Sequence, residues 1–229
     1  MGTDATGRRF AVWRPMTDPT DRPSSTAPPA RSSSRCRIPR DLVSIAAAGA
    51  IVLLSRGTLA DHYRVPSGSM LPTVEVGDRV LVDKSAYGLR LPLTSTYLIE
   101  LDAPARGEVV VLESPETGIV LLKRVVGVPG DSVAVRDGQV FIDGRAVPLL
   151  AEGGARYEAL GARPHPVAIG TGGPDFGPVA VPAGRYLVLG DNRDGSHDGR
   201  AFGFVERRAI LGRAERVYLR DGGLSWIDL

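Results

Sequence analysis

From residue 76 onward the chain is a succession of short apolar runs separated by turn-forming residues, and this pattern restricts the fold more than any other feature. The runs are DRVLVDK (78–84), GEVVVLES (107–114), GIVLLKRVVGV (118–128), DSVAVRDGQVFIDG (131–144), RYLVLGD (185–191) and RAERVYLR (213–220). Short runs rich in Val, Leu and Ile and bounded by Gly, Pro and Asp are typical of strands. Asp137-Gly138 between two such segments predicts a β-hairpin. We therefore predict a mainly β fold, a β-rich domain over residues 61–229.

Residues 143–183 depart from this pattern, because they are rich in Gly and Pro and have weak periodicity. We predict that they form an inserted β and loop lobe. The composition, 43% apolar and 24% charged, is that of an ordinary globular protein. A net charge of +2 without a basic helix or basic stripe gives no indication of a nucleic-acid partner. The single cysteine, Cys36, excludes an intrachain disulfide.

The first 60 residues fall into two segments. Residues 1–40 are rich in Arg, Ser and Pro and have no helical or strand period, which predicts a disordered segment, with a transit peptide as the alternative. Residues 42–60 are rich in apolar residues and carry one charge, Arg56. We favour a transmembrane anchor over residues 41–60; the alternatives are a buried helix, a cleaved signal sequence and an interfacial helix. Arginines before the anchor predict a cytoplasmic N-terminus and an extracytoplasmic domain after residue 60.

Three stretches could carry chemistry. The first is VPSGSMLPT (65–73), in which apolar residues flank Ser67 and Ser69. Taken alone, the stretch reads as a turn, since Pro, Gly and Ser are common turn residues.

The second stretch surrounds Lys123, which lies between Leu122 and Arg124 in an apolar run. Only two of the 28 basic residues are lysines. In a chain that otherwise uses arginine, we ask of each lysine what chemistry it supplies that arginine would not. A buried lysine can lose its proton, whereas arginine remains charged. Lys123 is therefore either a solvated lysine at a strand edge or a general base in a Ser–Lys pair.

The third stretch, GDNRDGSHDGRAFGFV (190–205), is dense in polar side chains but does not have EF-hand spacing. It is either a solvated loop or a scaffold that orients catalytic groups, in which Asp198 pairs with Arg200 and the Ser196 hydroxyl reaches an amine. The three histidines, His62, His165 and His197, have no metal-ligand spacing, and no G-x-S-x-G elbow is present. We expect no metal and no cofactor, and we expect all three histidines to be dispensable for activity.

In this order, after an apolar segment, PSGSMLPT, KRVVGVPGD and GDNRDGSHDGRAFGFV resemble the motifs of bacterial type I signal peptidases over about residues 42–217. The resemblance implies a β-rich catalytic core that rests on the membrane and is interrupted by a second β-lobe. It also implies a membrane-bound serine endopeptidase that removes signal peptides from exported preproteins after small residues, so that its partners are signal peptides and the lipid bilayer.

The resemblance assigns roles to individual residues. Ser69 matches the nucleophile and Lys123 the general base, and Ser67 matches the donor to the oxyanion. The supporting residues are Ser196, which bonds the lysine, and the pair Asp198 and Arg200. The substrate pocket is expected to be lined by Val65, Pro66, Met70, Leu121 and Leu122.

Three other interpretations share some of these features. A dedicated pilin or conjugative-transfer peptidase would have the same chemistry and a single substrate. A repressor-type self-cleaving protease would also use Ser and Lys, but no helix-turn-helix pattern precedes the catalytic half. An inactive anchored peptide-binding module would bind peptides without turnover.

Overall fold

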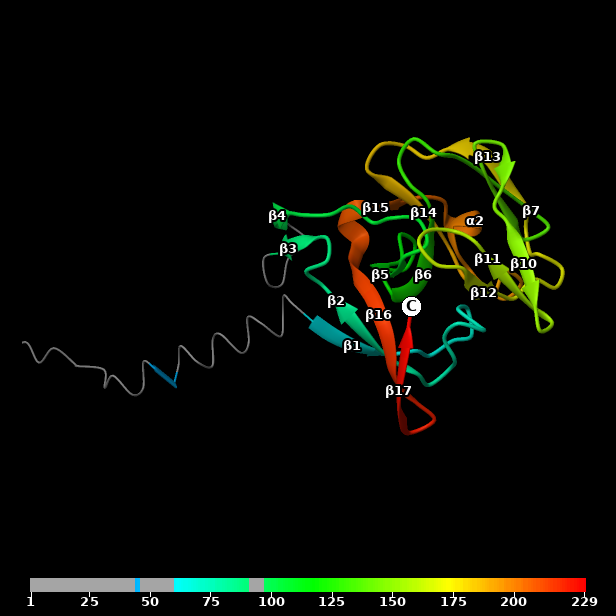
Figure 1. The fold of residues 1–229 in the computed structure, drawn as a ribbon. Coiled ribbons are helices and arrows are strands. Elements are labelled where there is room, and N and C mark those ends of the chain that lie inside the picture. Colours follow the sequence, from blue (N-terminus) through cyan, green and yellow to red (C-terminus); the bar gives the residue numbers. More distant parts are fainter. Residues whose placement is uncertain (1–43, 46–59, 91–96) are drawn as a thin grey trace, which may run out of the picture. The chain divides into compact units, whose positions relative to one another are not determined.

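The computed structural model of the 229-residue chain describes residues 44–45, 60–90 and 97–229. The described part is built almost entirely from strands (Figure 1), which confirms the predicted mainly β fold. Most of the predicted anchor, residues 41–60, lies outside the described residues, as does the predicted disordered segment, residues 1–40. In the part that is described, no helix is long and apolar enough to cross a membrane.

Short strands follow one another along most of the described chain, and helical turns interrupt them only near residue 200. The elements are β1 (Ala60–Arg64), β2 (Arg79–Asp83), β3 (Gly88–Arg90), β4 (Tyr97–Glu100), β5 (Val109–Glu113), β6 (Val120–Gly127), β7 (Ser132–Arg136), β8 (Gln139–Ile142), β9 (Arg145–Ala146), β10 (Leu149–Glu152), β11 (Ala155–Glu158), β12 (His165–Val167), β13 (Phe176–Ala180), β14 (Arg185–Leu189), α2 (Gly199–Phe202), β15 (Val205–Glu206), the 3₁₀-helix η1 (Arg207–Ala209), β16 (Ile210–Arg220) and β17 (Gly223–Asp228).

An eight-stranded sheet forms the largest part of the described fold. Its strand order is β1-β2-β16-β5-β6-β14-β15, and β17 pairs with β16. Non-consecutive strands are neighbours here, so segments far apart in sequence meet: β6 lies between β5 and β14. This crossing brings the strand that holds Lys123 beside the strand that leads into Gly190.

Between β6 and β14 the chain leaves the large sheet and forms two smaller sheets, with strand orders β13-β7-β8-β9 and β10-β11-β12. The strands of these sheets, yellow-green to yellow in Figure 1, gather on one side of the core. The expected insertion, residues 143–183, contains β9 to β13 of this lobe. At the β7–β8 turn, Asp137 and Gly138 have φ angles of 49° and 75°, the conformation that a two-residue hairpin of this type requires.

Valine-rich strands supply the core because alternate side chains of a strand face one side of the sheet. In β2, Val80 and Val82 are buried, whereas Arg79 and Leu81 beside them are exposed. A buried cluster around Val80 and Val82 also contains Val65 and Met70, so the predicted serine turn is attached to the core by its own apolar residues. Most of β5 is buried, as is β6 from Lys123 onward, which takes that lysine out of water.

Candidate active site

The turn that carries the two serines begins directly after β1. The Val65 N–H donates to the Asp78 carbonyl, and the turn is closed by hydrogen bonds from Leu71 N to Gly68 O (3.2 Å) and from Val74 N to Met70 O (2.9 Å). Val65 is 6% exposed and Met70 is fully buried, while Ser69 is only half-buried. The apolar residues of this stretch therefore fix the turn to the core and leave the serines at the surface.

Lys123 and Ser69 meet at this surface. Lys123 Nζ lies 2.7 Å from Ser69 Oγ, within hydrogen-bond distance. The lysine is 2% exposed. A nucleophile needs a base within this reach, so the pair has the geometry required for proton transfer from the hydroxyl to the amine.

Burial lowers the pKa of Lys123 to about 8 because the ammonium loses its hydration. The nearby carboxylates of Asp198 and Asp191 act in the opposite direction, and the Arg200 charge adds to the lowering. A substantial fraction of the amine is therefore neutral at mildly alkaline pH. A neutral amine is the form that can accept a proton from Ser69.

Asp198 and Arg200 form a buried pair behind the lysine. Arg200 Nε and Nη2 donate to the two oxygens of the Asp198 carboxylate, each at 2.9 Å. The same carboxylate accepts the Gly190 N–H at 3.0 Å and caps the short helix α2. The charges of this pair neutralise each other, so the carboxylate can remain ionised in a buried position.

At Gly190 the third motif, residues 190–205, packs tightly against the serine turn. A Cβ added there would overlap both the Ser196 hydroxyl and the Ser69 carbonyl oxygen. Only glycine lets the two segments pack this closely.

Ser196 lies in this contact but does not bond to Lys123. Its Oγ is buried and has no hydrogen-bond partner among the described residues. The hydroxyl lies near Asp198, and its proximity is among the causes that lower the pKa of that carboxyl against the opposing effect of burial. The predicted hydrogen bond between Ser196 and Lys123 is therefore absent from the described structure, although the Asp198 carboxylate beside Ser196 raises the pKa of Lys123 against the effect of burial.

A cavity of about 270 Å³ opens beside the Ser69–Lys123 pair. It is lined by Tyr63, Arg64, Val65, Pro66, Ser67, Ser69, Met70, Val80, Val111, Ile119, Val120, Leu121, Leu122 and Lys123. All five residues expected in the substrate pocket, Val65, Pro66, Met70, Leu121 and Leu122, are in this lining. Ser67, the expected oxyanion donor, is exposed at the same cavity.

One edge of β6 beside this cavity is free. Residues 120–124 pair with β5 on one side, whereas pairing with β14 on the other side begins at Arg124. Among the described strands, none pairs with Val120–Lys123 on the β14 side. An extended peptide can add to such an edge through main-chain hydrogen bonds.

Four polar residues that the sequence analysis did not single out hold the site together. Asn192 Nδ2 donates to Gly68 O and the Asn192 N–H donates to Ser69 O, each at 3.1 Å. The Asp191 carboxylate accepts both Arg124 Nε (2.8 Å) and Arg124 Nη2 (2.7 Å), and it also accepts the Thr73 hydroxyl at 2.5 Å. The third motif is therefore hydrogen-bonded to the serine turn both at Gly68 and Ser69 and at Thr73.

The described residues contain no group of three or more His, Cys, Asp or Glu side chains arranged to hold a metal ion.

Comparison of the sequence with known proteins shows which family this chain is similar to. The family model described as signal peptidase, peptidase S26, matches residues 40–219. Signal peptidase I of Pseudomonas aeruginosa is 37% identical over 202 residues, covering 78% of this chain and 69% of that protein. Signal peptidase I of Bacillus licheniformis is 35% identical, covering 73% of this chain and 81% of that protein. Signal peptidase I T of Bacillus subtilis is 36% identical, with 73% and 78% covered.

Proposed function

The chain belongs to the S26 family of signal peptidases, and we propose that it cleaves with Ser69 as the nucleophile and Lys123 as the general base. It is a serine endopeptidase that removes signal peptides from preproteins. The observation that carries the residue assignment is the 2.7 Å contact between Ser69 Oγ and the buried Lys123 Nζ.

In the proposed reaction, neutral Lys123 takes the proton from Ser69 as Oγ attacks the scissile carbonyl carbon. The Ser69 N–H and the Ser67 hydroxyl stabilise the oxyanion that develops. The protonated lysine then donates to the leaving amine, and an acyl-enzyme on Ser69 remains. Water, deprotonated by the same lysine, hydrolyses this ester and releases the signal peptide.

Substrate selection follows from the cavity and the free edge of β6. The peptide adds as a strand beside Val120–Lys123, so its main chain is recognised without regard to sequence. Side chains at alternate positions point into the cavity of about 270 Å³ that Met70 and Leu122 help to line. An apolar cavity of this size suits small side chains, as the expected cleavage after small residues requires.

We also propose that residues 41–60 anchor the enzyme in the plasma membrane, with residues 1–40 in the cytoplasm and residues 61–229 outside. The eight arginines that precede the apolar segment support this orientation. Protease added to intact spheroplasts is expected to digest the catalytic domain. Complete protection of that domain would contradict the orientation.

The activity itself is tested by incubating the purified full chain with a model preprotein and locating the cut by mass spectrometry. We expect a single cut at the end of the signal peptide by the wild type and none by Ser69→Ala. Binding of the preprotein by both proteins without any cut would indicate the inactive binding module instead. Cleavage of one pilin precursor only would indicate the dedicated peptidase.

A further inference from the structure

The inserted lobe is hydrogen-bonded directly to residues 191–193, the part of the third motif that contacts the serine turn. After β12, the Ala168 N–H donates to Asp191 O, and the Arg193 N–H donates to Ala168 O, each at 2.9 Å. Ala168 and Asn192 thereby form an isolated parallel bridge. Asn192 also donates its N–H to Ser69 O, so hydrogen bonds run continuously from the residue after β12 to the serine turn.

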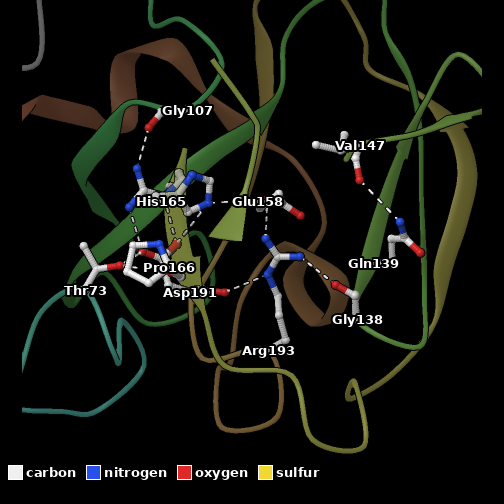
Figure 2. Close-up of polar contacts among 12 residues, drawn as sticks. Thr73, Gly107, Gly138, Gln139, Val147, Glu158, His165, Pro166, Asp191 and Arg193 are labelled. Atoms are coloured by element: carbon white, nitrogen blue, oxygen red, sulfur yellow. Dashed lines mark hydrogen bonds and ion pairs between the residues drawn. The ribbon is translucent and has the colours of Figure 1, made fainter. Parts of the chain in front are cut away.

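A buried ion pair reinforces this attachment (Figure 2). Arg193 Nη2 donates to Glu158 Oε2 at 2.6 Å, and both side chains are almost completely buried. The same guanidinium donates to Gly138 O at 2.7 Å and to Gly190 O at 3.2 Å. One arginine thus joins both small sheets of the lobe to the start of the third motif.

His165 lies between this pair and the Arg124–Asp191 pair. Its Nε2 is 3.4 Å from Glu158 Oε2 and 3.9 Å from Asp191 Oδ1, and Figure 2 shows how these three residues lie. The imidazole is only 5% exposed, and neither ring nitrogen has a hydrogen-bond partner within the described residues. Burying such a polar group is costly, so its position between two carboxylates calls for a role.

Asp191 connects His165 to the nucleophile. Its Oδ2 accepts the Thr73 hydroxyl, which also lies 3.3 Å from the carbonyl of Pro166, the residue after His165. Thr73 ends the turn in which Ser69 stands four residues earlier. The Asp191 carboxylate is therefore bonded directly to the end of that turn.

We propose that His165 is a positioning residue for Ser69, acting through Asp191 and Thr73. The imidazole lies beside Glu158 and presents Nε2 to Asp191 Oδ1, the oxygen that also accepts Arg124 Nε. This contact keeps Asp191 directed at Thr73 and holds Ser69 Oγ at hydrogen-bond distance from Lys123. His165 touches neither substrate nor Lys123, and the inference rests on the proposed roles of Ser69 and Lys123.

The test compares His165→Ala with His165→Gln in the purified full chain, using the model preprotein. Misplacing a reacting group by about 1 Å costs about 10² in rate. We expect His165→Ala to lower kcat by roughly 10- to 100-fold and to leave KM unchanged, because no residue of the substrate cavity is altered. His165→Gln, which retains an N–H near the position of Nε2, is expected to recover most of kcat.

A second readout uses the cavity of about 480 Å³ that His165 lines together with Arg124 and Leu160. Because this cavity reaches the position of the ring, added imidazole is expected to raise kcat of His165→Ala and to leave His62→Ala unaffected. His62 is an exposed histidine of β1 and serves as the matched control.

Wild-type kcat in His165→Ala would overturn the inference. So would a loss of activity that appears in KM alone, or a loss that follows a fall in melting temperature and that neither glutamine nor imidazole restores. Failure of the proposed function is distinguishable from these outcomes, because the wild type itself would then leave the preprotein uncut.

Discussion

Lys123 Nζ lies 2.7 Å from Ser69 Oγ, although 54 residues separate the two in sequence. The contact forms because β6 carries the lysine into the core while Val65 and Met70 fix the serine turn to that core. Base and nucleophile are thus positioned by apolar packing, and the same packing lowers the pKa of the base.

Lys123→Arg is expected to inactivate the enzyme although the positive charge is kept. A general base must be deprotonated before it acts, and the pKa of arginine, above about 12, prevents this. Cleavage of the preprotein by Lys123→Arg should fall to the level of Ser69→Ala at every pH tested. Substantial cleavage by Lys123→Arg would show that another group takes the proton.

Ser67→Ala is expected to lower kcat and leave KM nearly unchanged, because the hydroxyl acts on charge that exists only in the transition state. Loss of one oxyanion donor typically costs roughly 10²–10³ in rate. Steady-state kinetics on a peptide substrate measure the effect, and Ser67→Thr, which keeps a hydroxyl, is the matched control. Equal and small losses in Ser67→Ala and Ser69→Ala would mean that the stretch is only a turn.

Lys123→Met is expected to stabilise the protein while abolishing activity. Burial lowers the pKa of Lys123 from 10.5 to about 8, so folding disfavours the ammonium. At one pKa unit per 1.36 kcal/mol, the cost below pH 8 is about 3 kcal/mol, and it disappears as the pH rises from 8 towards 10.5. Urea unfolding at pH 6.5 and pH 10 should show a larger gain in unfolding free energy at the lower pH. A loss of stability at pH 6.5 would contradict the assignment of a buried, destabilised ammonium.

Asp198→Asn is expected to move the activity profile to lower pH. Burial lowers the pKa of Lys123, whereas the Asp198 carboxylate opposes that effect, so removing its charge lowers the lysine pKa below about 8. Arg200 is left without its carboxylate, which typically costs roughly 3–5 kcal/mol of stability. The profile is therefore measured at a temperature at which circular dichroism shows the variant folded. A limb that moves to higher pH would refute this electrostatic account.

The resemblance of the three motifs to those of type I signal peptidases is what leads from the sequence to Ser69, Lys123 and the residues of the cavity. The pairing of Asp198 with Arg200 is local, since they lie two positions apart. The Arg124–Asp191 and Glu158–Arg193 pairs are different, because they join residues 67 and 35 positions apart. Charged residues at such separations give no signal until the strand order is known.

His165 shows the same limit most clearly. In the sequence it cannot be told from His62 and His197, and the sequence predicts that all three are dispensable. In the structure His62 and His197 are exposed, whereas His165 is buried beside two carboxylates. The variant that tests for a histidine base should therefore replace His62 and His197 only. For Ser196 the sequence predicts a contact that the structure lacks. Its hydroxyl lies beside Asp198 and does not bond to Lys123.

The dependence of kcat/KM on pH, measured with the wild type and the double variant His62→Ala/His197→Ala, tests the Ser69–Lys123 account most directly. Because Lys123 must be neutral to act, activity should rise with pH along a single limb at about 8, identical in both proteins. A limb near the ordinary histidine pKa of about 6.5 that disappears in the double variant would contradict the account.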